Sequence, residues 1–279
     1  MMQPPLMTDR TALVRHRARA GLHACNRSAL FLHDLARSDI EERLNEVNRT
    51  FTAPAVVTGF PQMWADFHPD ACVVPDDDLL ALNPQHHDLV IHAMGLHWAN
   101  DPVGQLVQCR RALRPDGLCI VVLLGGATLN ELRTSLAEAE SAATGGLSPR
   151  VLPMGEIRDL GALMQRAGFA LPVADSVTQT VHYRDLGHLY ADLRAMGETN
   201  ALAARPRRFT RRTVLGSAEA VYRTSFATPE GKLRATFEMV FLTGWAPHDS
   251  QQQPLRPGAS RQRLADALGV AEKPLPKEG

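Results

Sequence analysis

The segment from Asp88 to Gly126 constrains the fold of this chain more than any other. It runs DLVIHAMGLHWANDPVGQLVQCRRALRPDGLCIVVLLGG. Two apolar runs, Leu89–Met94 and Leu118–Leu124, enclose a segment with helical spacing and a turn at Arg114–Gly117. This order predicts a strand, a helix and a second parallel strand. Ligands of open α/β sheets lie just beyond the carboxyl ends of such strands, so Leu96–Trp98 is expected near a site.

Apolar spacing and capping residues predict the other elements. A short buried strand is expected at 55–59, and capping boxes predict helix starts at Ser38 and at Thr128. Asp101 and Pro102 are a favourable helix start. Further helices are expected at 157–168, 186–197 and 214–222, and late strands at 171–183 and 233–243. Helices that alternate with strands predict an α/β fold: a mostly parallel sheet with helices on both faces.

Composition excludes several classes of function. The chain has 279 residues, with 30 Lys and Arg against 30 Asp and Glu, so net charge does not support nucleic-acid binding. No apolar stretch approaches the roughly 20 residues of a membrane helix, so no transmembrane segment is expected. The four cysteines, Cys25, Cys72, Cys109 and Cys119, form no C-x-x-C pair, which favours free thiols in a reducing compartment.

The two ends of the chain differ in composition from its middle. The N-terminal end is rich in arginine, which fits an organellar transit peptide or a basic surface helix. Its arginines are Arg10, Arg15, Arg17, Arg19 and Arg27. The C-terminal end, from Pro247, is rich in Pro, Gln and Arg, and we expect an extended tail. The expected organisation is an N-terminal helical segment at 1–52, an α/β domain at 53–246 and a tail at 247–279.

Several long motifs resemble one protein family. They are DLVIHAMGLHW (88–98), RRALRPDGL (110–118), LLGGATLNELRTSLAEAE (123–140), DLRAMGETNAL (192–202) and ATFEMVFLTGWAPHDSQ (235–251). Together they resemble the class I S-adenosylmethionine-dependent methyltransferases, most closely the complex I assembly factor 5 family and more distantly the malonyl-carrier-protein O-methyltransferases of biotin synthesis. The resemblance implies a Rossmann-like methyltransferase sheet with a helical insertion after the LLGG strand, at about 128–226. Bacterial members begin with a similar basic segment, so we interpret that segment as part of the protein.

The resemblance also implies a site. The family's cofactor is S-adenosylmethionine, and the positions that match its binding motifs are Gly59, Asp76, Asp77 and Leu96. The run Asp76–Asp78 aligns with the family acid that contacts the adenine amino group. His97 and Trp98 lie where the superfamily pocket faces the transferred methyl, either as pocket wall and general base or as packed structural residues.

The segment after the first strand departs from the family pattern. Family members carry an acidic, glycine-rich loop there, whereas this chain has Val57 in place of the acid and keeps only Gly59. Bulky Phe60, Met63 and Trp64 occupy the loop. A strand–helix–strand unit takes about 30 residues, so residues 60–75 cannot hold the usual elements and the first unit is expected to be truncated. The ribose-binding acid has no clear counterpart, although Asp66 or Asp70 could substitute.

A metal site is not expected. His86, His87, His92 and His97 lie close together in sequence, but no carboxylate or thiolate completes a tetrahedral ligand spacing with them.

Three functions stay open from the sequence. The first is a methyltransferase that uses S-adenosylmethionine on a protein or small-molecule substrate. The second is the arginine hydroxylation of a complex I subunit that the resemblance implies. The third is a non-catalytic, methyltransferase-like scaffold or assembly factor that has lost the cofactor. Catalysis is therefore an open question.

A protein client or partner subunit is expected to bind the basic segment Arg205–Arg212 and the tail. A solvated basic surface is the alternative for that segment. The family implies a cytoplasmic location in a bacterium and the mitochondrial matrix in a eukaryote.

Overall fold

The computed structural model describes residues 6–22 and 28–252. The chain divides into two compact units, residues 1–247 and 248–279. The first holds all the helices and strands named below. The helices are α1 (Arg10–Gly21), α2 (Phe31–Glu46), α3 (Pro61–Trp64), α4 (Pro102–Ala112), α5 (Asn130–Thr144), α6 (Ile157–Arg166), α7 (Leu186–Ala195) and α8 (Arg212–Phe226). The strands are β1 (Pro54–Thr58), β2 (Cys72–Val74), β3 (His87–Ala93), β4 (Leu113–Leu124), β5 (Ala170–Tyr183) and β6 (Leu233–Trp245).

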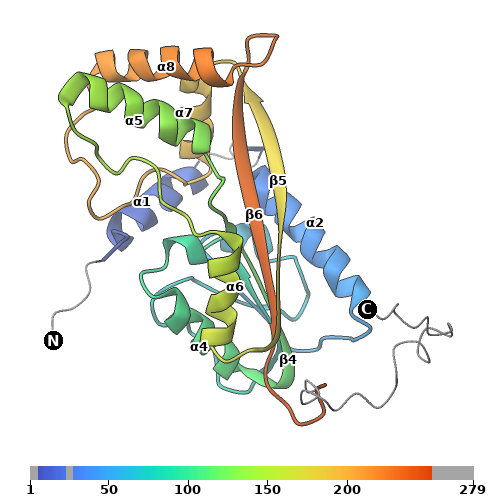
Figure 1. Ribbon diagram of the computed structural model, residues 1–279. Helices are drawn as coiled ribbons and strands as arrows, with labels where there is room; N and C mark the ends of the chain where they lie inside the picture. Colours follow the sequence, from blue (N-terminus) through green and yellow to red (C-terminus); the bar gives the residue numbers. More distant parts are fainter. Residues whose placement is uncertain (1–5, 23–27, 253–279) are drawn as a thin grey trace, which may run out of the picture. The chain divides into compact units, whose positions relative to one another are not determined.

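The strands form one sheet in the order β2-β1-β3-β4-β6-β5. The two long strands β5 and β6 lie side by side in Figure 1. The first four strands run parallel, with Val56 opposite Ile91 and Ile91 opposite Ile120. β6 runs antiparallel between β4 and β5, with Val122 opposite Phe241. The mostly parallel α/β sheet and its two late antiparallel strands confirm the predicted Rossmann-like methyltransferase fold.

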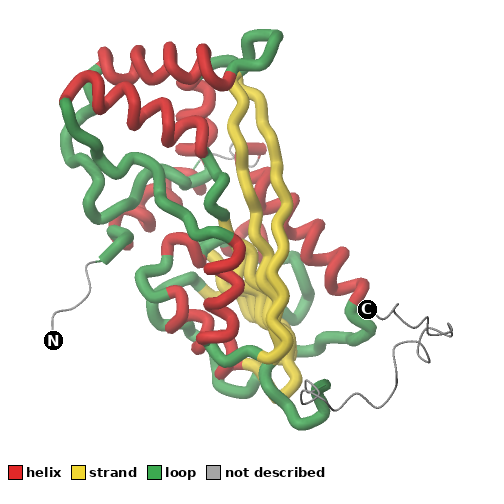
Figure 2. Tube along the Cα trace, in the orientation of Figure 1, coloured by secondary structure: helices red, strands yellow, loops and turns green. Residues whose placement is uncertain are grey.

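Helices cover both faces of the sheet (Figure 2). Val56 and Ile91 contribute to one core, with apolar residues of α2, α5, α7 and α8. Val57, Val90 and Val121 contribute to the other, with apolar residues of α4 and α6. Neighbouring residues of one strand enter opposite cores because side chains alternate across a strand. Both faces are buried, which explains the near-continuous apolar runs in the sequence.

The unit after β1 is truncated, as predicted. A four-residue helix, α3, and a three-residue strand, β2, are all that the described residues contain between β1 and β3. Phe60, Met63 and Trp64 are almost completely buried there. The Trp64 Nε1–H donates to His33 Nδ1 over 3.2 Å, which joins this loop to α2. Large side chains thus fill the volume beside β1.

Two predicted helix starts are wrong. α2 begins at Phe31, before Ser38, because Leu32, Ala36 and Ile40 make one buried stripe at helical spacing. α5 begins at Asn130, and the Thr128 hydroxyl is not its cap. Thr128 Oγ1 instead donates to the Glu238 carbonyl of β6 and accepts from the Glu238 N–H.

Glu131, the other half of the expected capping box at Thr128, also turns to β6. Its carboxylate accepts from the Thr236 hydroxyl over 2.6 Å and from the Thr236 N–H over 3.2 Å. Tertiary contacts therefore replace the local capping hydrogen bonds, and the start of α5 is joined to the sheet.

Other expectations concern thiols, membranes and the chain ends. Cys109 and Cys119 are free and buried, as predicted, and Cys72 is free and exposed. Cys25, Arg27 and residues 253–279 of the expected tail lie outside the described residues. Among the helices that the structure describes, none has the length and apolar composition needed to cross a membrane. The expected domain boundaries stay predictions.

Candidate functional site

The strand order reverses between β1 and β3. The chain passes from β1 outward to β2, returns to β3 on the other side of β1, and continues outward to β4. Open α/β sheets bind ligands at such a switch point, in the crevice beyond the carboxyl ends of the two strands. Gly59 follows β1 and Gly95 follows β3. These two glycines therefore form the floor of the expected ligand crevice.

Two side chains of the protein itself lie in this crevice. The Arg17 guanidinium approaches Gly59 so closely that a side chain at position 59 would overlap it. Asp76 Oδ2 would lie 2.5 Å from a Cβ atom at position 95. Arg17 Nη1 donates to both oxygens of Asp76, over 2.7 and 2.8 Å. Both side chains are buried, with 6% and 4% of their surface exposed.

The predicted cofactor residues are only partly brought together. Gly59 and Asp76 both lie beside Arg17 in the crevice. Asp77 is exposed and binds Arg10 Nη2 over 3.1 Å. Leu96 is buried in the core beneath α4 rather than in the crevice. Asp66 binds Arg37 over 2.6 Å, away from Gly59.

The residues present do not fit S-adenosylmethionine. The family places its ribose acid and its adenine acid after two different strands, and in the described residues β2 alone lies beyond β1. Asp76 follows β2, but Arg17 engages both of its carboxylate oxygens. A hollow of about 640 Å³ remains beside the pair, and α1 supplies one of its walls. We therefore derive no chemical step that uses this cofactor.

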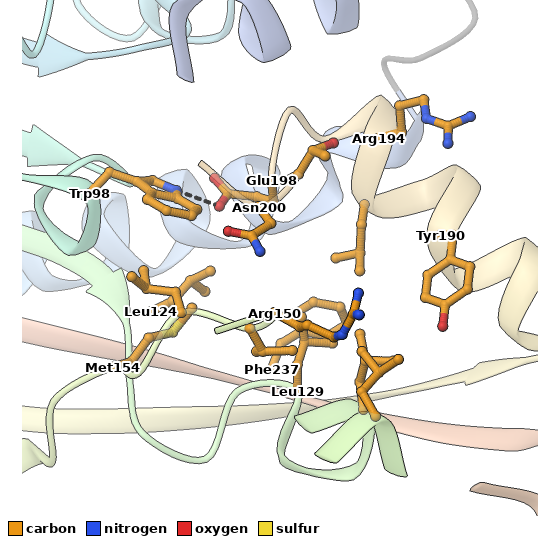
Figure 3. A pocket seen from close by; sticks show the side chains of 16 residues that line it. Trp98, Leu124, Leu129, Arg150, Met154, Tyr190, Arg194, Glu198, Asn200 and Phe237 are labelled. Atoms are coloured by element: carbon orange, nitrogen blue, oxygen red, sulfur yellow. Dashed lines mark hydrogen bonds between the residues drawn. The ribbon is translucent and has the colours of Figure 1, made fainter. Parts of the chain in front are cut away.

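A separate cavity of about 230 Å³ lies beyond the carboxyl end of β4, beneath α5 and α7 (Figure 3). Its walls are mostly apolar, and its polar side chains come from α7 and the loops after α5 and α7. The lining residues are Trp98, Leu124, Leu129, Leu132, Leu136, Arg150, Val151, Leu152, Met154, Tyr190, Leu193, Arg194, Glu198, Thr199, Asn200 and Phe237. An apolar cavity with a few polar groups is the usual form of a binding site. We call it the α5–α7 cavity.

Glu198 is the charged group buried at one end of the α5–α7 cavity. Its Oε2 accepts from Trp98 Nε1–H over 2.7 Å and lies 3.4 Å from His97 Nε2. Its Oε1 makes no hydrogen bond within the described residues. Burial raises the pKa of Glu198, but His97, Arg17 and Trp98 outweigh that effect and hold the pKa below its ordinary value. Glu198 is therefore ionised at neutral pH, with one oxygen available to a ligand.

His97 lies behind Glu198 and does not line the cavity. Its Nδ1 accepts a long hydrogen bond of 3.5 Å from the Leu124 N–H, so its proton is on Nε2, which donates to Glu198. Both ring nitrogens are engaged, so His97 orients the carboxylate, and Oε1 of Glu198 stays without a hydrogen bond. Trp98 lines the cavity.

The other end of the cavity has two polar groups, of which one lacks a hydrogen-bond partner and the other is fully paired. The Tyr190 hydroxyl is buried and has no hydrogen-bond partner in the described residues, and burial raises its pKa to about 12. Arg150 binds Glu140 through two nitrogens, over 2.9 and 2.6 Å, and Thr210 through the third. The charge of Arg150 is therefore neutralised. Arg194 is exposed at the cavity's rim.

Backbone strain is found where β3 and β4 reach the site. Met94 follows β3 with φ of 53°, and Leu129, a lining residue, precedes α5 with φ of 52°. Non-glycine residues in this conformation cost about 1–3 kcal/mol and persist only where surrounding contacts impose them. The Leu129 N–H donates to the Thr236 carbonyl over 2.7 Å, which provides such a contact.

The sequence analysis missed Arg17, Glu198 and Tyr190. Arg17 shares a helical face with Leu13 and Ala20, and that apolar spacing was a signal for burial. Glu198 follows the glycine that ends α7, inside the motif DLRAMGETNAL, but nothing local predicts that it faces Trp98. No group of three or more metal-binding side chains occurs among residues 6–22 and 28–252.

Comparisons with known proteins place the chain in a family. No family model matches it. The chain is 35% identical over 238 residues to "Arginine-hydroxylase NDUFAF5, mitochondrial" of Danio rerio, a match that covers 85% of this chain and 74% of that protein. It is 38% identical over 192 residues to the human protein of that name, covering 69% of this chain and 55% of the relative. A malonyl-[acyl-carrier protein] O-methyltransferase of Halorhodospira halophila is 31% identical over 203 residues, covering 73% and 67%.

Comparison with solved structures finds similar chains at low sequence identity. The YcgJ protein of Bacillus subtilis is 9% identical, with a TM-score of 0.47, and covers 75% of this chain and 97% of its own. An S-adenosylmethionine-dependent methyltransferase from Thermotoga maritima is 13% identical, with a TM-score of 0.39, and covers 78% and 92%. The match to the arginine hydroxylases covers about half of the human relative and three quarters of the Danio rerio relative. At 35–38% identity over these lengths, the chain belongs to the NDUFAF5 family, the complex I assembly factor 5 family of methyltransferase-like proteins.

Proposed function

We propose that this protein acts as an assembly-factor-type protein that binds a client protein by taking one of its arginine side chains into the α5–α7 cavity. The observation that carries the proposal is Glu198, an ionised carboxylate in an apolar cavity with Oε1 unpaired in the described residues. A buried carboxylate oxygen without a hydrogen bond is costly, so the cavity favours a ligand that donates to Oε1 and supplies a positive charge. No methyl transfer is part of this function.

The other groups of the cavity suit a guanidinium on an apolar stem. Trp98 lies next to Glu198, and an indole ring attracts a flat cation placed over its face. The unpartnered Tyr190 hydroxyl can accept a further N–H. Leu132 and Leu136 offer an apolar wall to the methylene groups of the stem. A volume of about 230 Å³ suits one long side chain better than a whole cofactor.

The names of the relatives support the same substrate class. Five relatives at 35–38% identity are named arginine hydroxylases and mitochondrial. Our proposal concerns the recognition of arginine by this chain, and it is independent of any oxidation of that arginine. The same names support a mitochondrial location for a eukaryotic chain, and a bacterial chain would act in the cytoplasm.

A client would also contact the basic segment Arg205–Arg212. Arg205 and Arg207 already bind Asp9, over 2.9 and 3.2 Å. Arg208, Arg211 and Arg212 are exposed and make no ion pair within the described residues, and Phe209 between them is fully exposed. An acidic client segment with an apolar residue would match this surface.

Peptide binding tests the proposed function. The probes are two blocked, fluorescently labelled pentapeptides that differ at their central residue, arginine in one and citrulline in the other. Citrulline keeps the shape of arginine and loses its charge. We expect the arginine peptide to bind at least about tenfold more tightly, because truncation of a buried charge pair typically costs at least 2 kcal/mol.

The variant Glu198→Gln should remove that preference, and the matched control Glu138→Gln, an exposed position on α5, should keep it. Circular dichroism would show whether both variants stay folded. Equal affinity of the native protein for the two peptides, or binding of neither, would exclude arginine recognition in this cavity.

A further inference from the structure

A cluster of three side chains from three separate segments lies in the switch-point crevice, beside the hollow of about 640 Å³. Arg17 comes from α1, Phe60 from the end of β1 and Asp76 from the end of β2. We call them the switch-point cluster. The Arg17 guanidinium lies over the Phe60 ring, 5.7 Å from its centroid, and Phe60 is 1% exposed. The cluster occupies the point where an open α/β sheet binds its ligand.

Hydrogen bonds hold the acid of the cluster from several directions. Arg10 Nη2 donates to the Asp76 carbonyl over 2.9 Å and also lies 3.4 Å from Asp76 Oδ1. Gln105 Nε2 on α4 donates to the carbonyls of Asp76 and Asp77, over 3.3 and 3.1 Å. The backbone of Asp76 is therefore fixed independently of its side chain. The carboxylate is built into the fold and is not free to turn toward a ribose or an adenine.

The charges of the crevice balance among themselves. Two arginines, Arg10 and Arg17, face two aspartates, Asp76 and Asp77, so the crevice attracts neither anions nor cations strongly. Nε and Nη2 of Arg17 have no hydrogen-bond partner within the described residues. Their neighbour is the Phe60 ring, a weak acceptor for a cation, and Phe60 is one of the bulky residues in the loop that is glycine-rich in the family.

The cluster also supports the loop after α7. A Cβ atom at Gly197 would lie 2.8 Å from Phe60 Cζ and 3.3 Å from the Arg17 Cα. His16 Nδ1 on the same helix lies 3.0 Å from the Thr199 carbonyl. The loop that carries Glu198 therefore rests directly on α1 and Phe60. Arg17 thus lies between the ends of the strands and the loop that carries Glu198. A bound nucleotide would otherwise lie at this position of the fold.

We infer that Arg17, held by Asp76 and Phe60, is a built-in substitute for the cofactor, so that this protein folds and keeps its site without S-adenosylmethionine. The truncated unit after β1 and the presence of Arg17 in the crevice are linked. Loss of one strand brings Asp76 next to β1, and the Arg17 side chain from α1 then pairs with it. The inference does not depend on which client the α5–α7 cavity takes.

Calorimetric titration of the full chain with S-adenosylmethionine and with S-adenosylhomocysteine tests this inference directly. We expect no heat of binding, and no shift in thermal unfolding, at millimolar ligand. A class I methyltransferase titrated in the same buffer shows that the ligands are active. Binding at micromolar concentration would overturn the inference, because it would require Arg17 to leave the crevice.

A second measurement tests the cluster itself. Arg17→Gln and Asp76→Asn should each lower the midpoint of thermal unfolding by roughly 10 °C, since each breaks the buried ion pair between the two residues. The double variant should lose much less than the sum of the two. Arg15→Gln, exposed on the same helix, should leave the midpoint unchanged. Additive losses in the double variant would show that the two residues do not act as a pair and would also overturn the inference.

Discussion

The switch-point crevice and the α5–α7 cavity both lie at the carboxyl ends of parallel strands, and they differ in how their polar groups are satisfied. In the crevice, Arg17 and Asp76 neutralise each other, and the Phe60 ring packs against Arg17. In the cavity, one oxygen of Glu198 accepts no hydrogen bond and the Tyr190 hydroxyl has no partner among the described residues. The charges of the crevice are therefore paired within the protein, whereas the cavity offers unpaired oxygen atoms to a ligand.

This contrast separates fold from function in a methyltransferase-like protein. The fold supplies a ligand crevice at its switch point, but the side chains decide whether the crevice still receives one. Here an ion pair of the protein itself occupies the switch point, and the neighbouring cavity has kept polar groups without partners. Substitutions in the first region should therefore change stability, and substitutions in the second should change binding.

The largest expected effect follows from removing the Phe60 ring. Phe60→Ala takes out a side chain that is 1% exposed and contacts His33 and Arg17, so we expect a loss of about 3–5 kcal/mol in the free energy of unfolding. Urea denaturation measures it. The exposed Leu22→Ala should change stability by less than about 0.5 kcal/mol. A loss for Phe60→Ala as small as that of the control would mean that the crevice is not part of the core.

A smaller effect is expected at the ion pair next to the cavity. Arg150 and the Ser148 N–H hold the pKa of Glu140 at about 2, compared with 4.5 in the unfolded chain. Because the folded pKa is depressed, the stabilisation is present above pH 4.5 and is lost as the pH falls toward 2. Both side chains are largely buried, so we expect Glu140→Gln to cost about 2–3 kcal/mol at neutral pH.

The same variant gives a sharper test in its pH dependence. Unfolding of the native protein should become easier as the pH falls through this range, and Glu140→Gln should weaken that dependence. Glu138→Gln, on the exposed face of α5, is the control. Parallel stability curves for the native protein and Glu140→Gln would show that the pair does not contribute.

Much of the fold could be predicted because its signals are local. The apolar runs at 89–94 and 118–124 and the short segment at 60–75 each determine an element without reference to the rest of the chain. Gly59 and Asp76 were grouped only by the family resemblance, because no strand was predicted at 72–74. The other predictions needed only local apolar patterns and segment length.

The polar contacts could not be predicted, because they join distant segments. Arg17 pairs with Asp76, 59 positions away, and nothing within α1 indicates that an acid lies over its apolar face. Glu131 was expected to cap its own helix, but it reaches Thr236 on β6 instead. The same side-chain atoms can cap a helix or form a hydrogen bond with a distant strand. Which hydrogen bond forms depends on the packing of the helix against the sheet.

Filling the cavity should block binding with little change in stability. Leu136→Phe places a larger side chain on the wall formed by α5, where an open volume of about 230 Å³ can accept it. We expect a change of less than about 1.5 kcal/mol in the free energy of unfolding and at least a tenfold loss of affinity for the arginine peptide. Thermal unfolding and peptide anisotropy measure the two effects. Unchanged affinity would place the client outside this cavity.

The smallest effect on stability is expected for Tyr190→Phe. This variant distinguishes a binding site with an unpaired hydroxyl from a core in which each hydroxyl is hydrogen-bonded. Removing a hydroxyl that is hydrogen-bonded within the protein usually costs about 1 kcal/mol, whereas removing a buried, unpartnered one should cost nothing or stabilise slightly. We therefore expect stability within about 0.5 kcal/mol of the native value, together with a loss of arginine-peptide affinity of about two- to fivefold. Tyr222→Phe is the matched control, because the Tyr222 hydroxyl donates to the Arg234 carbonyl over 2.7 Å, and it should lose stability without losing affinity. If the two variants changed stability and affinity equally, the Tyr190 hydroxyl would not be a ligand-binding group.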